Sequence, residues 1–149
     1  MRFRFIWPGK TRDARFRALV EEYSDRLSHF CRCEYTELRE KPGAGIEEES
    51  KRISDALRSG SVNVMLDPGG VEWKSAEVAR QVQSWENSAV KEVAFVVGGP
   101  EGLSDNLLQR ANKRWSLSQL TLTHEMARVL LLEQLYRAYT ILHGMPYQK

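Results

Sequence analysis

The first part of the chain alternates between two hydrophobic patterns. Residues 2–7 alternate basic and apolar side chains as far as Ile6 and stop at Pro8 and Gly9, which is typical of a short strand ended by a breaker pair. Between residues 13 and 27, apolar side chains recur every three or four positions, with charged residues between them. This spacing predicts an amphipathic helix directly after the first strand.

The same two patterns recur along the rest of the chain, separated by glycine and proline. We expect further strands over residues 31–38, 62–66 and 92–97, and further helices over residues 46–58 and 75–85. The order of elements predicts an α/β fold with a parallel sheet of five to six strands and helices on both faces.

The strand expected over residues 92–97 is the most apolar of the set. Strands without polar alternation are typical of parallel sheets that helices cover on both faces, so this strand is predicted to lie centrally. The strand over residues 62–66 is expected to end at the turn-forming segment Asp67-Pro68-Gly69-Gly70.

A last helix is expected between the N-cap Thr123 and a stop near His143, before Gly144 and Pro146. Its apolar positions cover more than one stripe, so one face is predicted to meet a surface beyond its own sheet. No repeat, low-complexity tract or long linker divides the chain. Residues 1–149 are therefore predicted to form a single domain.

The composition agrees with one cytoplasmic domain that needs no metal. The chain has 149 residues, 42% hydrophobic and 28% charged, and its formal charge of +2 excludes histone-like and acidic-tail proteins. Cys31 and Cys33 are too few for a disulfide framework, and with His29 they lack the second ligand pair of a metal site. No leader-like segment opens the chain, and no apolar run approaches the roughly 20 residues that span a bilayer.

Two glycine-containing segments that follow predicted strands fall short of nucleotide-binding motifs. Gly9-Lys10-Thr11 has Arg4 where a P-loop requires a glycine, and Pro100 stands at the second glycine position of a dinucleotide fingerprint. Glycines at the carboxyl end of a central strand still let a ligand approach the backbone closely. The segment over residues 98–102 is therefore predicted to be either a ligand loop or a simple tight turn.

Three segments of the second half together carry a family resemblance. They are FVVGGPEGLS over residues 95–104, WSLSQLTLTH over residues 115–124, and the last-helix positions Arg128-Val129 and 133–138. This combination closely resembles the RlmH-type methyltransferases, small enzymes of the SPOUT class that methylate a pseudouridine of 23S ribosomal RNA at N3. The resemblance includes Leu66-Asp67, the Pro146-Tyr147 tail and the total length, so it covers the whole chain.

The resemblance implies a C-terminal trefoil knot, contrary to the general rule against knots, and S-adenosylmethionine bound in it. It also implies a homodimer in which the tail of one subunit faces the cofactor of the other, with Tyr147 as a candidate substrate contact. The family usually ends Pro-Tyr-His, whereas Gln148 follows Tyr147 here. The cofactor-binding positions that match the family motif are Leu66, Gly98, Gly99, Leu117, Ser118, Gln119, Leu120, Thr121 and Leu122.

For the reaction that the resemblance implies, the N3 imide proton must leave before or while the methyl group moves. His124 is the first candidate for handling this proton, and Arg128 or Arg137 for stabilising the resulting anion. His124 and Arg128 lie one helical turn apart, so both can face one pocket, although a solvent-facing pair has the same spacing. Each of the three side chains could instead hold a backbone phosphate or a helix end.

The densest basic cluster lies near the start of the chain. We predict that these residues contact RNA phosphates within the ribosome, while a solvated helix face is the alternative. Two other functions stay open, namely a SPOUT methyltransferase of another RNA such as tRNA, and a ribosome-binding factor without catalysis. The predicted RNA contacts are Arg2, Arg4, Lys10 and Arg12, with Arg15 and Arg17 in the same cluster.

Overall fold

A computed structural model describes residues 1–147 and shows a five-stranded sheet in which every neighbouring pair of strands is parallel. The strand order is β2-β1-β4-β3-β5, which agrees with the predicted parallel α/β fold. The strands are β1 (Arg2–Pro8), β2 (Arg32–Leu38), β3 (Val62–Glu72), β4 (Glu92–Val96) and β5 (Lys113–Ser116). The helices are α1 (Ala14–Ser28), α2 (Ile46–Ala56), α3 (Ser75–Asn87), α4 (Asp105–Leu108) and α5 (His124–Leu142).

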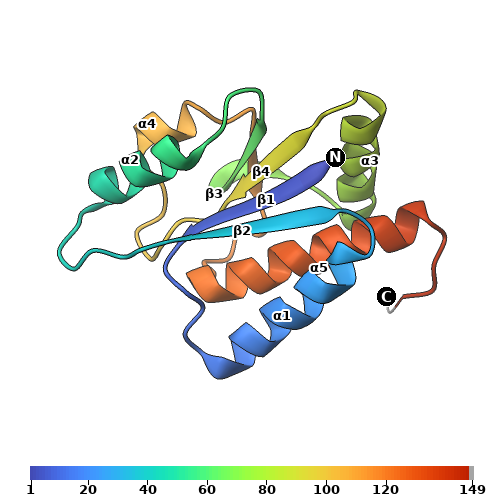
Figure 1. Ribbon diagram of the computed structural model, residues 1–149, viewed down its shortest axis with the longest axis horizontal. Helices are drawn as coiled ribbons and strands as arrows, with labels where there is room; N and C mark the ends of the chain where they lie inside the picture. Colours follow the sequence, from blue (N-terminus) through green and yellow to red (C-terminus); the bar gives the residue numbers. More distant parts are fainter. Residues whose placement is uncertain (148–149) are drawn as a thin grey trace.

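Helices cover both faces of the sheet, as predicted (Figure 1). On one face α5 packs against α1 and α3, and on the other face α2 packs against α4. The alternation in β1 explains this division: Phe3 and Phe5 point into the larger core, whereas Ile6 joins Ile53 of α2 in the smaller core. The strand β4 lies at the centre with all of its residues buried, which confirms its predicted place.

The strand β3 differs from its prediction because it does not end at Asp67. It continues to Glu72, with a register shift against β5 between Leu66 and Val71. Gly70 permits this bulge, since a β-carbon there would collide with the backbone carbonyl of Arg114. The Nε of Arg114 also donates to the carboxylate of Asp67 at 3.1 Å, so the segment expected to stop the strand instead pairs with its neighbour.

Side-chain caps begin two of the predicted helices where the sequence indicated. Asp13 accepts the backbone N–H of Arg15 at 2.8 Å ahead of α1, and Thr123 accepts that of Met126 at 3.2 Å ahead of α5. The helix α2 ends at Ala56, two residues earlier than predicted, because Leu57 is extended. Two short elements, α4 and β5, were not predicted.

The broad apolar surface of α5 has an explanation within the chain. The helix lies between α1 and α3 as well as against the sheet, so buried positions occur around much of its circumference. Met126 and Ile141 remain 37% and 46% exposed. The width of the apolar surface therefore does not by itself require a second subunit, and the predicted homodimer stays a prediction.

Candidate functional site

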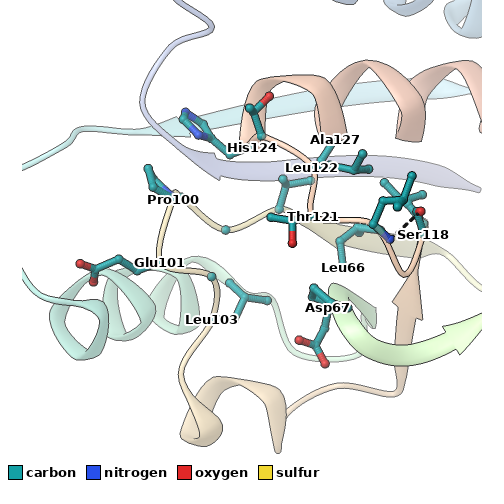
Figure 2. Close-up of a pocket in the computed structure, with 18 of the residues that line it drawn as sticks. Leu66, Asp67, Pro100, Glu101, Leu103, Ser118, Thr121, Leu122, His124 and Ala127 are labelled. Atoms are coloured by element: carbon teal, nitrogen blue, oxygen red, sulfur yellow. Dashed lines mark hydrogen bonds between the residues drawn. The ribbon is translucent and has the colours of Figure 1, made fainter.

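A cavity of about 650 Å³ opens at the carboxyl edge of the sheet (Figure 2). It lies between the loop after β4 and the segment that leads into α5, and β3 and β5 contribute to its floor. In Figure 2, His124 and Pro100 lie at one end, and Ser118 and Leu66 lie at the other. The volume and the mixture of apolar and polar groups are typical of a small-molecule site.

The loop after β4 is a tight turn whose backbone lines the cavity. The N–H of Gly102 donates to the carbonyl of Gly99 at 3.0 Å, which closes the turn. A β-carbon on Gly98 would lie 2.8 Å from the carbonyl oxygen of Gly102, so only glycine fits at this position. Residues 98–102 therefore form a tight turn, which was one interpretation, and they also lie where a ligand loop is expected, which was the other.

The segment before α5 forms the opposite wall and is shaped by its own serines. The hydroxyl of Ser116 donates to the carbonyl of Ser118 at 2.9 Å, and the hydroxyl of Ser118 accepts the N–H of Leu120 at 2.9 Å. Leu117 and Leu122 are half-buried against the cavity, whereas Leu120 is 74% exposed. All three leucines line the cavity, and Leu120 does so with most of its side chain open to solvent.

The charged residues among the described lining of the cavity are acidic. Asp67 and Glu101 line it, and no Lys or Arg of residues 1–147 does. Arg114 neutralises Asp67 through an ion pair, whereas Glu101 is exposed at the turn. The lining therefore favours a neutral or positively charged ligand over a polyanion such as a nucleoside triphosphate.

The structure brings together almost all of the residues expected to bind a cofactor. Every one of them lines the cavity except Gln119, which is exposed beside it. The sequence interpretation missed some lining residues although they lie next to predicted ones. The missed residues are Asp67, Pro68, Val97, Leu103, Trp115, Thr123 and Ala127, whereas Pro100, Glu101 and Gly102 belong to the segment 98–102, for which a ligand loop was one of the two interpretations.

His124 and Arg128 do not face the same pocket, so that expectation is wrong. His124 and Ala127 line the cavity, whereas Arg128 is fully buried and does not line it. Arg128 donates to the carbonyl of Pro8 at 2.7 Å and to the hydroxyl of Thr11 at 3.1 Å. Its guanidinium also lies over the ring of Trp7, and burial lowers the pKa of Arg128. In this chain Arg128 holds the loop after β1.

Within one chain, Arg137 lies far along α5 from His124, and Tyr147 lies beside Arg137 in the tail that follows α5. Thirteen residues separate Arg137 from His124, which places them about 20 Å apart along the helix. The guanidinium of Arg137 lies 4.6 Å from the ring centroid of Tyr147, whose hydroxyl is 3.2 Å from that of Tyr23 and 3.3 Å from Glu133. Burial and these hydrogen bonds raise the pKa of the Tyr147 hydroxyl. Gln148 lies outside the described residues.

Two of the four predicted RNA contacts lie in the loop after β1, at the same edge of the sheet as the cavity. Lys10 and Arg12 are both exposed there, and Arg12 forms an ion pair with Glu40 at 2.6 Å. Glu125 of α5 accepts the backbone N–H of Arg12 at 2.9 Å and that of Asp13 at 3.0 Å. The first turn of α5 therefore fixes this basic loop close to His124.

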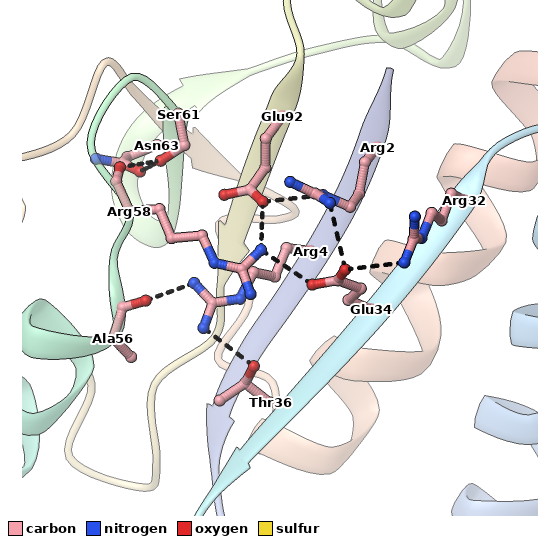
Figure 3. A network of polar contacts seen from close by, with 10 residues as sticks. All are labelled: Arg2, Arg4, Arg32, Glu34, Thr36, Ala56, Arg58, Ser61, Asn63 and Glu92. Carbon is pink, nitrogen blue, oxygen red and sulfur yellow. Dashed lines mark hydrogen bonds and ion pairs between the residues drawn. The ribbon is translucent and has the colours of Figure 1, made fainter.

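The other two predicted contacts lie at the opposite edge of the sheet, within a network of ion pairs (Figure 3). Arg4 is only 6% exposed, and its guanidinium donates to the carbonyl of Ala56 and, at 3.2 Å, to the hydroxyl of Thr36. Arg2 is half-buried and donates to Glu92 at 3.1 Å. Because the Arg4 side chain is buried against the end of α2, the interpretation of Arg4 as an RNA contact is not retained, whereas the contact of Arg2 stays a prediction.

The described part of the chain was also compared with what a metal site and a membrane-spanning helix require. No group of three or more His, Cys, Asp or Glu side chains within residues 1–147 could hold a metal ion. None of the helices described is both long and apolar enough to cross a membrane.

Comparison with known proteins finds similarity along almost the entire chain. Residues 1–148 match the family model described as "Predicted SPOUT methyltransferase". Two proteins named "Ribosomal RNA large subunit methyltransferase H", from Gemmatimonas aurantiaca and Desulfotalea psychrophila, are each 40% identical to this chain. In each comparison, 100% of this chain and 100% of the relative are covered. The protein of that name from Geotalea daltonii is 38% identical, with 99% of each chain covered. The chain belongs to the SPOUT methyltransferase family.

Proposed function

We propose that this protein transfers a methyl group from S-adenosylmethionine to N3 of a pseudouridine in 23S ribosomal RNA, on assembled ribosomes in the cytoplasm. The observation that carries the proposal is the cavity between the turn over residues 98–102, the glycine turn, and residues 117–122, in a member of a methyltransferase family. His124 lies at the rim of this cavity. The relatives are named for ribosomal RNA of the large subunit, which supports this class of substrate.

The residues of the cavity fit S-adenosylmethionine. Gly98 leaves room where any other side chain would meet Gly102, and Leu66, Leu117 and Leu122 offer apolar surface to an adenine ring. The acidic lining suits a ligand with a positively charged sulfur. We assign the holding of this cofactor to Leu66, Gly98, Gly99, Leu117, Ser118, Gln119, Leu120, Thr121 and Leu122. When bound, the cofactor supplies an electrophilic methyl group.

The proposed trefoil knot, single domain and homodimer rest on the same resemblance. The glycine turn and residues 117–122 lie against one cavity although β5 intervenes between them, which agrees with a knotted C-terminal region. One sheet takes strands from residue 2 to residue 116, which supports one domain over residues 1–149. Exposed Leu120, Met126 and Met145 offer apolar surface for a second copy, whose Arg137 and Tyr147 would then approach the cavity.

The chain's own groups would handle the proton and the charge of the acceptor. His124 would accept the N3 proton at an imidazole nitrogen, since its side chain lies at the rim of the cavity, where the pseudouridine would enter. Arg137 and Tyr147 of the second copy are the candidates for stabilising the anion on the flanking carbonyls. Arg128 would act only by holding the loop after β1.

Replacing His124 with Ala should lower turnover by about 100-fold or more and leave cofactor affinity within about threefold, because a general base acts on the acceptor. Single-turnover methyl transfer and calorimetric titration with S-adenosylmethionine would measure the two effects. His29→Ala, a change at an exposed histidine remote from the cavity, is the control. A turnover equal to that of the unmodified protein would remove His124 from this role.

Replacing Lys10 and Arg12 together with Ala should weaken RNA binding and lower the slope of log affinity against log salt by about 1 to 2, because two phosphate contacts are lost. Binding to ribosomes would be measured between low and physiological salt. The control pair, Arg32→Ala with Lys91→Ala, removes the same charge at the other edge of the sheet. An unaltered slope in the first variant would place the RNA elsewhere.

The function itself is tested by methyl transfer from labelled S-adenosylmethionine to ribosomes from a strain that lacks its own enzyme. Mass spectrometry of the nucleosides should then show N3-methylpseudouridine. Label that appears in tRNA and not in ribosomes would favour the alternative RNA substrate. Binding to ribosomes without any binding of S-adenosylmethionine would favour the non-catalytic ribosome-binding factor.

A further inference from the structure

The helix α2 contacts both ends of the loop over residues 99–104, the glycine loop. It lies on the face of the sheet opposite to α5. At the first end, the carboxylate of Glu49 lies against the backbone of Gly99, whose N–H acts to lower the pKa of that carboxyl group. A β-carbon on Gly99 would lie only 2.9 Å from Oε1 of Glu49. At the other end, the buried hydroxyl of Ser50 accepts the backbone N–H of Ser104 at 3.0 Å. Two consecutive residues of α2 thus hold the start and the end of the loop over residues 99–104.

The contact continues beyond the loop. The hydroxyl of Ser104 caps α4 by accepting the N–H of Leu107 at 3.2 Å, and Leu107 packs with Ile53 of α2 in the smaller core. Arg110, just after α4, donates to the carbonyl of Ser54 at 2.8 Å. The helix α2 and the short helix α4 therefore form one support on which the glycine loop rests.

Glu49 occupies its place at an electrostatic cost. Burial raises its pKa, and the carboxylates of Glu40 and Glu101 act in the same direction, although the N–H of Gly99 and the charge of Arg52 partly offset them. Glu47 lies on the same turn of α2 and is exposed to solvent. Helix formation alone would be served equally well by a solvated carboxylate at position 49. The half-buried position of Glu49 therefore points to its contact with the loop.

We propose that Glu49 is a positioning residue for the cofactor: by accepting the Gly99 N–H, with Ser50 holding Ser104, it keeps the glycine loop in the shape that binds S-adenosylmethionine. The proposal rests on the function proposed above. Glu49 does not line the cavity and would act through Gly99, which does. Removing the acceptor would let the loop adopt other conformations, which lowers the fraction of protein competent to bind.

The test compares Glu49→Ala with Glu49→Gln, which keeps an oxygen acceptor, and with Glu47→Ala as the matched control on the same helical turn. Cofactor affinity would be measured by calorimetry with S-adenosylmethionine, and KM for cofactor and for ribosomes by methyl transfer. Hydrogen exchange of the backbone amides over residues 98–104 would be measured without any ligand. The thermal midpoint would be recorded for each variant.

We expect Glu49→Ala to weaken cofactor binding about tenfold, the effect of losing one hydrogen bond to a charged group, and to raise KM for the cofactor but not for ribosomes. The amides over residues 98–104 should exchange about tenfold faster in this variant. Glu49→Gln should recover most of both effects, and Glu47→Ala should show neither. The thermal midpoints should stay close together, because Glu49 is only partly buried.

The proposal is overturned if Glu49→Ala matches the unmodified protein in affinity and exchange, or if Glu49→Gln or Glu47→Ala is impaired to the same extent. Failure of the proposed function has a different signature, since the unmodified protein would then not bind S-adenosylmethionine. The exchange measurement would still decide whether Glu49 holds the loop.

Discussion

Replacing Gly98 with Ala is expected to weaken S-adenosylmethionine binding by at least about 100-fold, or about 2.7 kcal/mol, while the protein remains folded. The added β-carbon would lie 2.8 Å from the carbonyl oxygen of Gly102, which is backbone and cannot rotate away. The turn would have to open, and both its shape and the cavity that it lines would change. Calorimetric titration with the cofactor measures the loss.

The control for this variant is Gly45→Ala. Gly45 precedes α2 with a φ of −81°, and a β-carbon there meets nothing within 4 Å. Circular dichroism should give the same spectrum for both variants and for the unmodified protein. Undiminished cofactor binding by Gly98→Ala would show that the cofactor does not depend on this turn, and the assignment of the cavity would fail.

Replacing Arg128 with Met is expected to lower the free energy of unfolding by about 3 kcal/mol. Methionine preserves much of the apolar volume but leaves the carbonyl of Pro8 and the hydroxyl of Thr11 buried without their donor, and it removes the cation from the ring of Trp7. Urea denaturation would measure the change, which corresponds to a fall in the thermal midpoint of roughly 10 °C.

The comparison that isolates this effect is Arg17→Met, at an exposed position of α1, which should change stability by less than about 0.5 kcal/mol. Below its unfolding range, Arg128→Met should keep its affinity for S-adenosylmethionine, because Arg128 does not line the cavity. Unchanged stability with a large loss of turnover would reverse our assignment and return Arg128 to a role in catalysis.

The longer elements followed from the sequence because their signals are local. The alternation before Pro8 and the spacing after Asp13 are properties of short windows, and they place β1 and α1 to within about one residue. The elements α4 and β5 have four residues each, too few for either period to be recognised. The continuation of β3 past Asp67 depends on Arg114, a residue far along the chain, and no local pattern contains it.

The candidate site was predictable only in part. The motif around Gly98 and the segment 117–122 were found through family resemblance, and the cavity brings all of those positions together except Gln119. Periodicity alone gave no reason to join the two segments. Helical spacing did place His124 and Arg128 one turn apart, but it could not tell that the neighbouring helix face is buried under Trp7.

By itself, therefore, the sequence determined the order and type of the long elements, the α/β class and, through its motifs, the family. The tertiary structure alone decided the strand order, the burial of Arg4 and Arg128, and the contact of Glu49 with Gly99. The physical reason is the range of the interactions. Caps and periodicity act within a few residues, whereas the environment of a charged side chain depends on segments that meet only when the sheet has formed.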